Sequence, residues 1–208
     1  LDEPTSFLDI RYKLELLSML KQLVREKQLA VVMSLHEIDL AQKVSDHILC
    51  VRHNAVDRYG TPEEIFSGGY IAELYGITSG SYNEAFGFPE LQAARGQPQV
   101  FVIGGGGSGI PIYRRLQQRG IPFAAGILHE NDMDYPVASM LAVEVISEHA
   151  YQPIAKQTLQ SACAAMDACR YVLCPCQTFG PLNQANEQLR QRAGRKLCDE
   201  LPDLPCEA

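Results

Sequence analysis

The sequence has 208 residues, of which 46% are hydrophobic and 21% charged, so it can bury a sizeable core and wholesale disorder is excluded. Its net charge of −7 lacks the basic character that a phosphate backbone requires, so we expect no nucleic-acid partner. The apolar runs are too short to cross a bilayer, and seven irregularly spaced cysteines fit reduced thiols in a cytoplasm better than a disulfide framework.

The first part of the chain alternates between strand and helix patterns. The chain begins with Leu1, inside what has the pattern of a buried strand end, which suggests a fragment. Apolar residues spaced three and four apart predict a helix over 10–27. Apolar runs predict strands at 29–35, buried on both faces, and at 47–52, with a short helix at 37–45 between them. This order predicts a mostly parallel sheet.

A helix start and a linker follow. The beginning of a helix is indicated by Thr61, which is followed by Pro62 and two glutamates. Residues 78–98 are rich in Gly, Ser, Pro and Gln and have little periodicity, which favours a linker. We therefore expect one domain at 1–77 and another at 99–208.

The domain expected at 99–208 repeats a strand–helix pattern four times. Such a series predicts a small, doubly wound Rossmann-like α/β domain. The predicted strands are 99–103, 122–128, 142–147 and 170–175, and the helices lie near 109–119, 134–142, 155–166 and 182–194.

The first nine residues carry the most chemistry. Asp2 and Glu3 directly follow an apolar position, and a carboxylate pair there is costly without a cation. Mg²⁺ with a nucleoside triphosphate supplies one, because Mg²⁺ binds through one carboxylate, waters and phosphates. Asp2 would hold the metal and Glu3 would orient the attacking water. Ser6 and Asp9 lie where they can cap the following helix or reach another chain, and His36 follows the next strand, where an imidazole can contact a γ-phosphate.

These residues carry a family resemblance. The segment LDEPTSFLD, a helix, and then VVMSLHEIDLAQKVSDHILCV resemble the carboxyl half of the nucleotide-binding subunit of an ATP-binding cassette (ABC) transporter. The resemblance covers about residues 1–77. It makes Asp2 and Glu3 the end of the Walker B strand, places Ser6 and Asp9 in the D-loop and makes His36 the switch histidine.

The resemblance implies a P-loop-type ATPase that uses ATP and Mg²⁺. It also implies head-to-tail pairing with a second copy of the subunit and membrane permease subunits, so that the protein would lie in the cytoplasm on the inner face of the cell membrane. The stretch after His36 looks most like importers of iron-siderophore complexes, haem or cobalamin.

The resemblance is incomplete. In the family, the Walker A loop, Q-loop and signature motif precede Walker B, and these 208 residues contain none of them; FSGGY (66–70) resembles the signature but follows His36. We therefore expect an incomplete ATPase core, and a chain that alone neither binds nor hydrolyses ATP. We also expect an exposed sheet edge and apolar faces around residues 1–53.

A glycine run opens the second domain. Gly104, Gly106 and Gly109 satisfy G-x-G-x-x-G between a predicted strand and helix, where backbone N–H groups can bind an anion. No Lys-Ser/Thr follows, so the run is not a P-loop. Glu130 and Asp132 lie where the dinucleotide fingerprint expects an acid on the ribose hydroxyl.

Three interpretations of this run remain open: a tight turn or protein contact, a sensor of a small anionic ligand or metal complex, and NAD-type binding. Asn183 and Asn186 are candidate ligand contacts on the same edge. Cys174 and Cys176 are spaced as C-x-C rather than C-x2-C, so we expect inert thiols. The alternative function is a small-molecule or nucleotide-sensing regulatory module beside a non-functional ATPase remnant.

Overall fold

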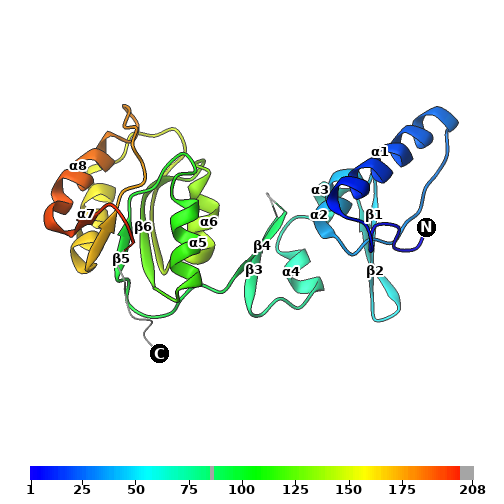
Figure 1. The fold of residues 1–208 in the computed structure, drawn as a ribbon, viewed down its shortest axis with the longest axis horizontal. Helices are drawn as coiled ribbons and strands as arrows, with labels where there is room; N and C mark the ends of the chain where they lie inside the picture. Colours follow the sequence, from blue (N-terminus) through cyan, green and yellow to red (C-terminus); the bar gives the residue numbers. More distant parts are fainter. Residues whose placement is uncertain (85–86, 202–208) are drawn as a thin grey trace. The chain divides into compact units, whose positions relative to one another are not determined.

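The computed structural model describes residues 1–84 and 87–201, which form two compact units (Figure 1). The first unit contains Leu1–Thr78 and Tyr82–Pro89, and the second contains Ser79–Ser81 and the chain from Glu90 onward. The helices of the described residues are all too short or too polar to cross a lipid bilayer.

The first unit begins with a long helix, α1 (Ile10–Lys27), which confirms the prediction for this segment. The Asp9 carboxylate caps it by accepting hydrogen bonds from the N–H groups of Arg11 (3.0 Å) and Tyr12 (3.2 Å). Its apolar stripe is less buried than the sequence suggests. Leu17 is the one residue of α1 that is fully buried, and Leu23 is 42% exposed.

The strand expected at 29–35 is not formed, and this prediction is wrong. The segment is extended and lies beside Leu1–Glu3, where Ser34 N donates to Leu1 O at 3.1 Å. Val32 is 85% exposed. A strand buried on both faces needs layers packed over each face. None of the strands in residues 1–84 and 87–201 forms a sheet with residues 29–35. The apolar exposure expected around residues 1–53 is confirmed.

Helix α2 (Ile38–Val44) and strand β1 (Ile48–Arg52) form as predicted, but β1 pairs antiparallel with β2 (Ala55–Gly60). The prediction of a mostly parallel sheet in this unit is therefore wrong. His53 and Asn54 both have positive φ, which fits a two-residue hairpin turn. Five of the six β2 residues are exposed, so the strand has no apolar alternation by which the sequence could reveal it.

Two short helices complete the first core. Thr61 begins α3 (Pro62–Ile65) as expected and forms a capping box with Glu64, and α4 (Tyr70–Leu74) follows. A small two-stranded sheet, β3 (Gly80–Asn83) with β4 (Phe88–Leu91), lies within the segment expected to be a linker. The buried cluster of this unit consists of Cys50, Ile65, Phe66, Tyr70 and Ile71.

The second unit is built on a parallel sheet with the order β7-β6-β5-β8-β9. This arrangement confirms the α/β, doubly wound prediction, and β9 is the strand that the sequence did not reveal. The strands are β5 (Val100–Val102), β6 (Phe123–His129), β7 (Glu144–Glu148), β8 (Tyr171–Leu173) and β9 (Leu197–Cys198).

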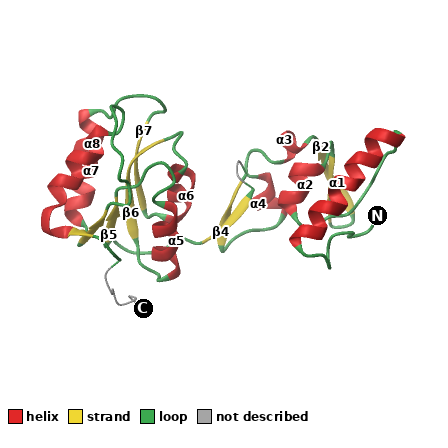
Figure 2. Cartoon of the chain, turned by 45° about the horizontal axis from the view of Figure 1, so that its top comes forward, coloured by secondary structure: helices red, strands yellow, loops and turns green. Residues whose placement is uncertain are grey.

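Helices cover both faces of this sheet (Figures 1 and 2). On one face Tyr113 stacks on Phe123 with ring centroids 5.3 Å apart, and on the other Phe101 packs in a cluster with Met166 and Leu189. From β5 the chain adds β6 and β7 on one side of the sheet and then β8 and β9 on the other, so the strand order changes direction between β5 and β8. Sheets of this kind bind ligands at the carboxyl ends of the two strands where this change occurs. One face carries α5 (Ile110–Gln118) and α6 (Asp134–Leu141); the other carries α7 (Lys156–Ala168) and α8 (Gln184–Ala193), after which the 3-10 turn η1 (Gly194–Lys196) leads into β9.

Candidate functional site

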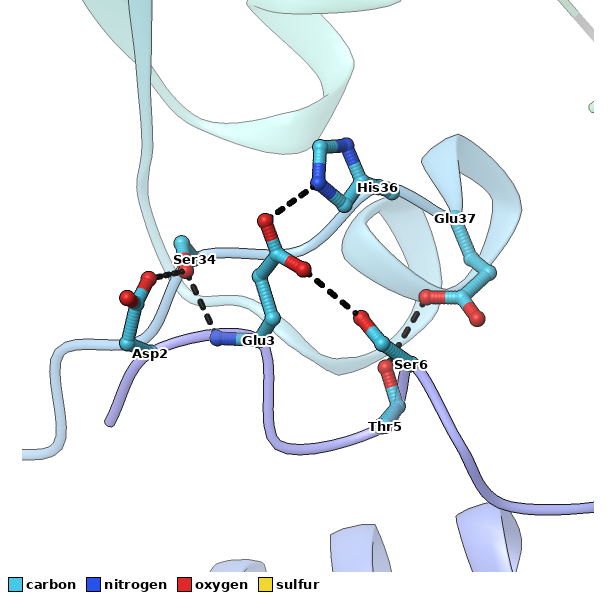
Figure 3. Close-up of polar contacts among 7 residues, drawn as sticks. All are labelled: Asp2, Glu3, Thr5, Ser6, Ser34, His36 and Glu37. Carbon is cyan, nitrogen blue, oxygen red and sulfur yellow. Dashed lines mark hydrogen bonds and ion pairs between the residues drawn. The ribbon is translucent and has the colours of Figure 1, made fainter.

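Ser34 joins the two acidic residues at the start of the chain (Figure 3). Glu3 N donates to Ser34 Oγ at 2.8 Å, and Ser34 Oγ donates to Asp2 Oδ1 at 2.7 Å. Together with the bond between Ser34 N and Leu1 O, these contacts hold the two extended segments side by side. Ser34 was not among the site residues predicted from the sequence, although a serine inside the apolar run at 29–35 was a visible signal.

Glu3 and His36 meet at the end of these segments. Glu3 Oε1 lies 2.5 Å from His36 Nε2, and Ser6 Oγ donates to Glu3 Oε2 at 3.0 Å. Glu3 has a φ of 41°, a left-handed conformation that costs about 1 kcal/mol for a residue with a side chain. The Glu3 side chain is 45% exposed and that of His36 is 74% exposed, so this carboxylate–imidazole pair is open to solvent. An oriented, accessible carboxylate of this kind can act as a general base.

A second layer of contacts lies beneath this pair. The buried Thr5 hydroxyl donates to Glu37 Oε2 at 2.9 Å, and Lys13 Nζ bonds to Glu37 Oε1. These contacts, first Lys13 and then Thr5, hold the pKa of Glu37 below its ordinary value. Glu37 is therefore charged near neutral pH, and its carboxylate links Thr5, in the turn before α1, to Lys13 in α1. The sequence analysis missed this layer, whose one signal was a glutamate directly after His36.

Ser6 and Asp9 use their side chains within the unit. Asp9 caps α1, which is one of the two roles left open for it, and the Ser6 hydroxyl contacts Glu3.

The site formed by Asp2, Glu3 and His36 has oxygen ligands suited to an Mg²⁺ ion that is bound through one protein side chain. Asp2 is exposed and offers the hard carboxylate oxygen that Mg²⁺ prefers. Among residues 1–84 and 87–201, no group of three or more His, Cys, Asp or Glu side chains is arranged to hold a metal ion. The 208 residues contain no P-loop sequence.

The glycine run in the second unit is bound by carboxylates of the chain itself. Gly106 N donates to both oxygens of Asp132, each at 3.0 Å. Asp134 Oδ2 accepts from Gly105 N at 2.5 Å and from Gly109 N at 3.0 Å. The Asp132 carboxylate thus already accepts a hydrogen bond from the glycine run, and its expected contact with a ribose hydroxyl stays a prediction.

The other candidate ligand residues make contacts elsewhere. Glu130 lies 3.3 Å from His149 Nδ1. Asn183 accepts from Gly180 N at 2.6 Å and donates to the carbonyl of Thr178. Asn186 is 1% exposed and bonds to the backbone of β6, which corrects its interpretation as a ligand contact. The ligand roles expected for Glu130 and Asn183 stay predictions.

The C-x-C pair holds protonated thiols. Cys174 Sγ donates to the carbonyl of Cys176, and Cys176 Sγ donates to that of Thr178. Burial raises the pKa of Cys174 to about 11 and also raises that of Cys176. Since the thiolate is the form that binds metals and attacks electrophiles, both side chains behave as small apolar groups near neutral pH. Cys206 lies outside the described residues.

Comparison with known proteins identifies the relatives of this chain. The ABC transporter ATP-binding protein MJ0873 of Methanocaldococcus jannaschii, described as uncharacterized, is 40% identical over 120 residues, which are 56% of this chain and 40% of that protein. The cobalamin import ATP-binding protein BtuD of Halobacterium salinarum is 28% identical over 173 residues, 79% of this chain and 43% of BtuD. The homologues of this chain are ATP-binding proteins of ABC transporters.

The ABC relatives differ in how much of the chain they match. The ferric enterobactin transport ATP-binding protein FepC of Escherichia coli is 35% identical over 77 residues, 37% of this chain and 28% of FepC. A family model described as the MJ0874 family matches residues 123–198, inside the second unit. The chain spans about two fifths of the length of the first relatives it matches.

Proposed function

We propose that residues 1–77 form the part of an ABC importer ATPase that carries its catalytic carboxylate. The observation that carries the proposal is the contact between Glu3 and His36, two side chains 33 positions apart that meet at 2.5 Å. The ABC relatives support this proposal. ATP and Mg²⁺ would be its cofactors, and the 208 residues alone would neither bind nor hydrolyse ATP, because they contain no P-loop sequence.

Each residue of the site has a role in this proposal. Asp2 would hold Mg²⁺, which neutralises phosphate charge when bound. Glu3 would accept a proton from the attacking water and fix its direction, with its own carboxylate held by the Ser6 hydroxyl. His36, already in contact with Glu3, would donate a hydrogen bond to the γ-phosphate. Ser6 and Asp9 would lie on the side that faces a second copy of the subunit.

The setting and cargo follow from the relatives. Relatives are named for cobalamin import, ferric enterobactin transport and petrobactin import, and we therefore propose a cobalamin or iron-siderophore complex as the cargo, with haem as the other member of this class. The subunit would work with membrane permease subunits, on the cytoplasmic face of the membrane.

The test places the 208 residues behind a segment that supplies the P-loop, Q-loop and signature, and measures ATP turnover and ATP binding. We expect Glu3→Gln to lower kcat at least about 100-fold while ATP still binds. Glu15→Gln is the matched control, since Glu15 pairs with Arg11 on the exposed side of α1. Unchanged turnover in Glu3→Gln would refute the role of Glu3. Turnover by the 208 residues alone, abolished by Glu3→Gln, would refute their dependence on another segment.

A second candidate function concerns the second unit alone. The MJ0874 family match lies wholly within this unit, which favours a module with its own role, such as small-molecule sensing beside an inactive ATPase remnant. Thermal unfolding of the full chain with NAD⁺, ATP, haem and cobalamin tests it. A selective rise in Tm supports the sensor, and unchanged Tm with all four compounds rejects it for these ligands.

A further inference from the structure

The turn between β5 and α5 gathers backbone N–H groups around one point. Gly105, Gly106 and Gly107 have φ values of 146°, 63° and 85°, which residues with side chains rarely adopt. This path turns the N–H groups of Gly105, Gly106 and Gly109 toward the loop after β6. Because the turn also opens a nine-residue helix, the positive end of the helix dipole adds to their attraction for an anion.

Two carboxylates fill this place, one from the loop after β6 (Asp132) and one from the first residue of α6 (Asp134). Asp134 is fully buried and accepts from Gly105 N and Gly109 N, while its Oδ1 also accepts from Ile110 N at 3.1 Å. Asp132 accepts from Gly106 N and, at 2.9 Å, from Asp134 N. Five backbone N–H groups therefore surround two carboxylates, which is the donor pattern that a bound phosphate would receive.

The floor of the turn leaves no space for a ligand to enter from below. A Cβ at Gly104 or at Gly109 would lie 2.3 Å from the Tyr113 hydroxyl. Tyr113 is fully buried and stacks on Phe123, so its ring cannot move away without disturbing the core. Tyr113 thus fills the space beneath Gly104 and Gly109, and the two carboxylates lie beside the turn, while Gly106 and Gly107 face open space.

We propose that this turn is an internal anion site in which Asp132 and Asp134 are the permanent anion. The G-x-G-x-x-G sequence of this chain serves to bind these carboxylates and does not bind a pyrophosphate. A compound that approaches this edge of the sheet meets carboxylate oxygens in place of free N–H groups. Dinucleotides, free nucleotides and inorganic phosphate are therefore excluded as ligands of this turn, so a sensor in the second unit would bind its ligand elsewhere.

The first experiment uses the unmodified 208-residue chain. Amide resonances of Gly105, Gly106 and Gly109 are followed by NMR while inorganic phosphate, NAD⁺ or ATP is added at constant ionic strength. We expect no shift beyond that given by sodium chloride. A saturable shift of these amides with any of the three compounds would overturn the proposal.

The second experiment empties the site. In Asp132→Ala and Asp134→Ala we expect a lower Tm that sodium formate partly restores in a concentration-dependent way, because formate supplies the missing carboxylate to the freed N–H groups. Glu130→Ala is the matched control, since Glu130 lies in the same loop and contacts His149; its Tm should not respond to formate beyond wild type. If Asp134→Ala does not fold, Asp132→Ala decides the result. A folded variant whose Tm responds to formate no more than wild type would overturn the proposal.

Discussion

Asn186 on α8 binds both backbone polar groups of Ile127 in β6. Its side-chain oxygen accepts from Ile127 N at 3.1 Å and its side-chain nitrogen donates to Ile127 O at 2.9 Å. The pairing of β6 with β7 shifts register between Gly126 and Leu128, which leaves Ile127 without a partner in the ladder. The side chain of Asn186 therefore replaces a neighbouring strand at this position.

This relationship predicts a large cost for Asn186→Ala. Removing the amide leaves a buried donor and a buried acceptor unpaired, at about 1–3 kcal/mol each, so we expect the free energy of unfolding to fall by about 3 kcal/mol. Chemical denaturation of the chain, followed by a probe in the second unit, measures it. Asn183→Ala is the control, because Asn183 bonds only within its own surface loop, and it should cost about 1 kcal/mol. Equal stability of the two variants would contradict the role given to Asn186.

The sequence predicted most of the second unit and less of the first. In the second unit each of the four predicted strands is an apolar run beside a helix, so the hydrophobic period and the order of elements are sufficient to predict them, whereas β9 has only two residues and gives no such pattern. Asn186 was misinterpreted because its loop neighbours are polar, although it lies three and seven residues before Leu189 and Ala193 on the buried face of α8. In the first unit, β2 has mostly exposed residues, so no pattern could separate it from a loop.

The candidate sites, like the fold, could be predicted only in part from the sequence. The contact between Glu3 and His36 joins distant segments, so composition and period could not place them together, and only the family resemblance did. The glycine spacing correctly indicated converging N–H groups after β5. It could not show which anion they bind, because the answer depends on where the loop after β6 directs Asp132 and Asp134.

Gly109→Ala should destabilise the second unit strongly. The new Cβ would lie 2.3 Å from the hydroxyl and 2.4 Å from Cζ of Tyr113, whose ring is held in the core. Overpacking of this kind costs about 1–3 kcal/mol. Gly180→Ala is the matched control, since the nearest atom to its Cβ is Asn183 Oδ1 at 3.9 Å, and its Tm should stay near wild type. A Gly109→Ala variant as stable as Gly180→Ala would show that the turn has room for a side chain.

Tyr113→Phe should leave stability unchanged or raise it by about 1 kcal/mol. The Tyr113 hydroxyl is buried and has no hydrogen-bond partner among the residues that the structure describes. Removing an unsatisfied polar atom while keeping the ring relieves its desolvation cost and preserves the stacking on Phe123. Denaturant unfolding measures this change, and Tyr113→Phe should also reduce the cost of Gly109→Ala in the double variant. A loss above 1 kcal/mol would mean that the hydroxyl has a partner.

Acid should weaken the second unit through Glu148, at the end of β7. Its carboxylate accepts from Ala155 N at 2.8 Å, from Thr158 Oγ1 at 2.8 Å and from His149 N at 3.1 Å. The bond from Ala155, and then that from Thr158, lowers the pKa of Glu148 from its ordinary value of 4.5. A lowered pKa in the folded state means that the charged form stabilises the fold above pH 4.5 and that this contribution is lost as the pH falls through the lower value.

Comparing Glu148→Gln with wild type isolates this contribution. Near neutral pH we expect the variant to be about 1 kcal/mol less stable, since bonds to a charged group are worth more than neutral ones but Glu148 is partly exposed. The difference should shrink toward zero as the pH is lowered below about 4.5, because wild type then also carries an uncharged side chain. Glu200→Gln, at an exposed position after β9, should show no such trend. A gap between Glu148→Gln and wild type that stays constant from pH 7 to pH 3 would mean that Glu148 acts through its shape and not through its charge.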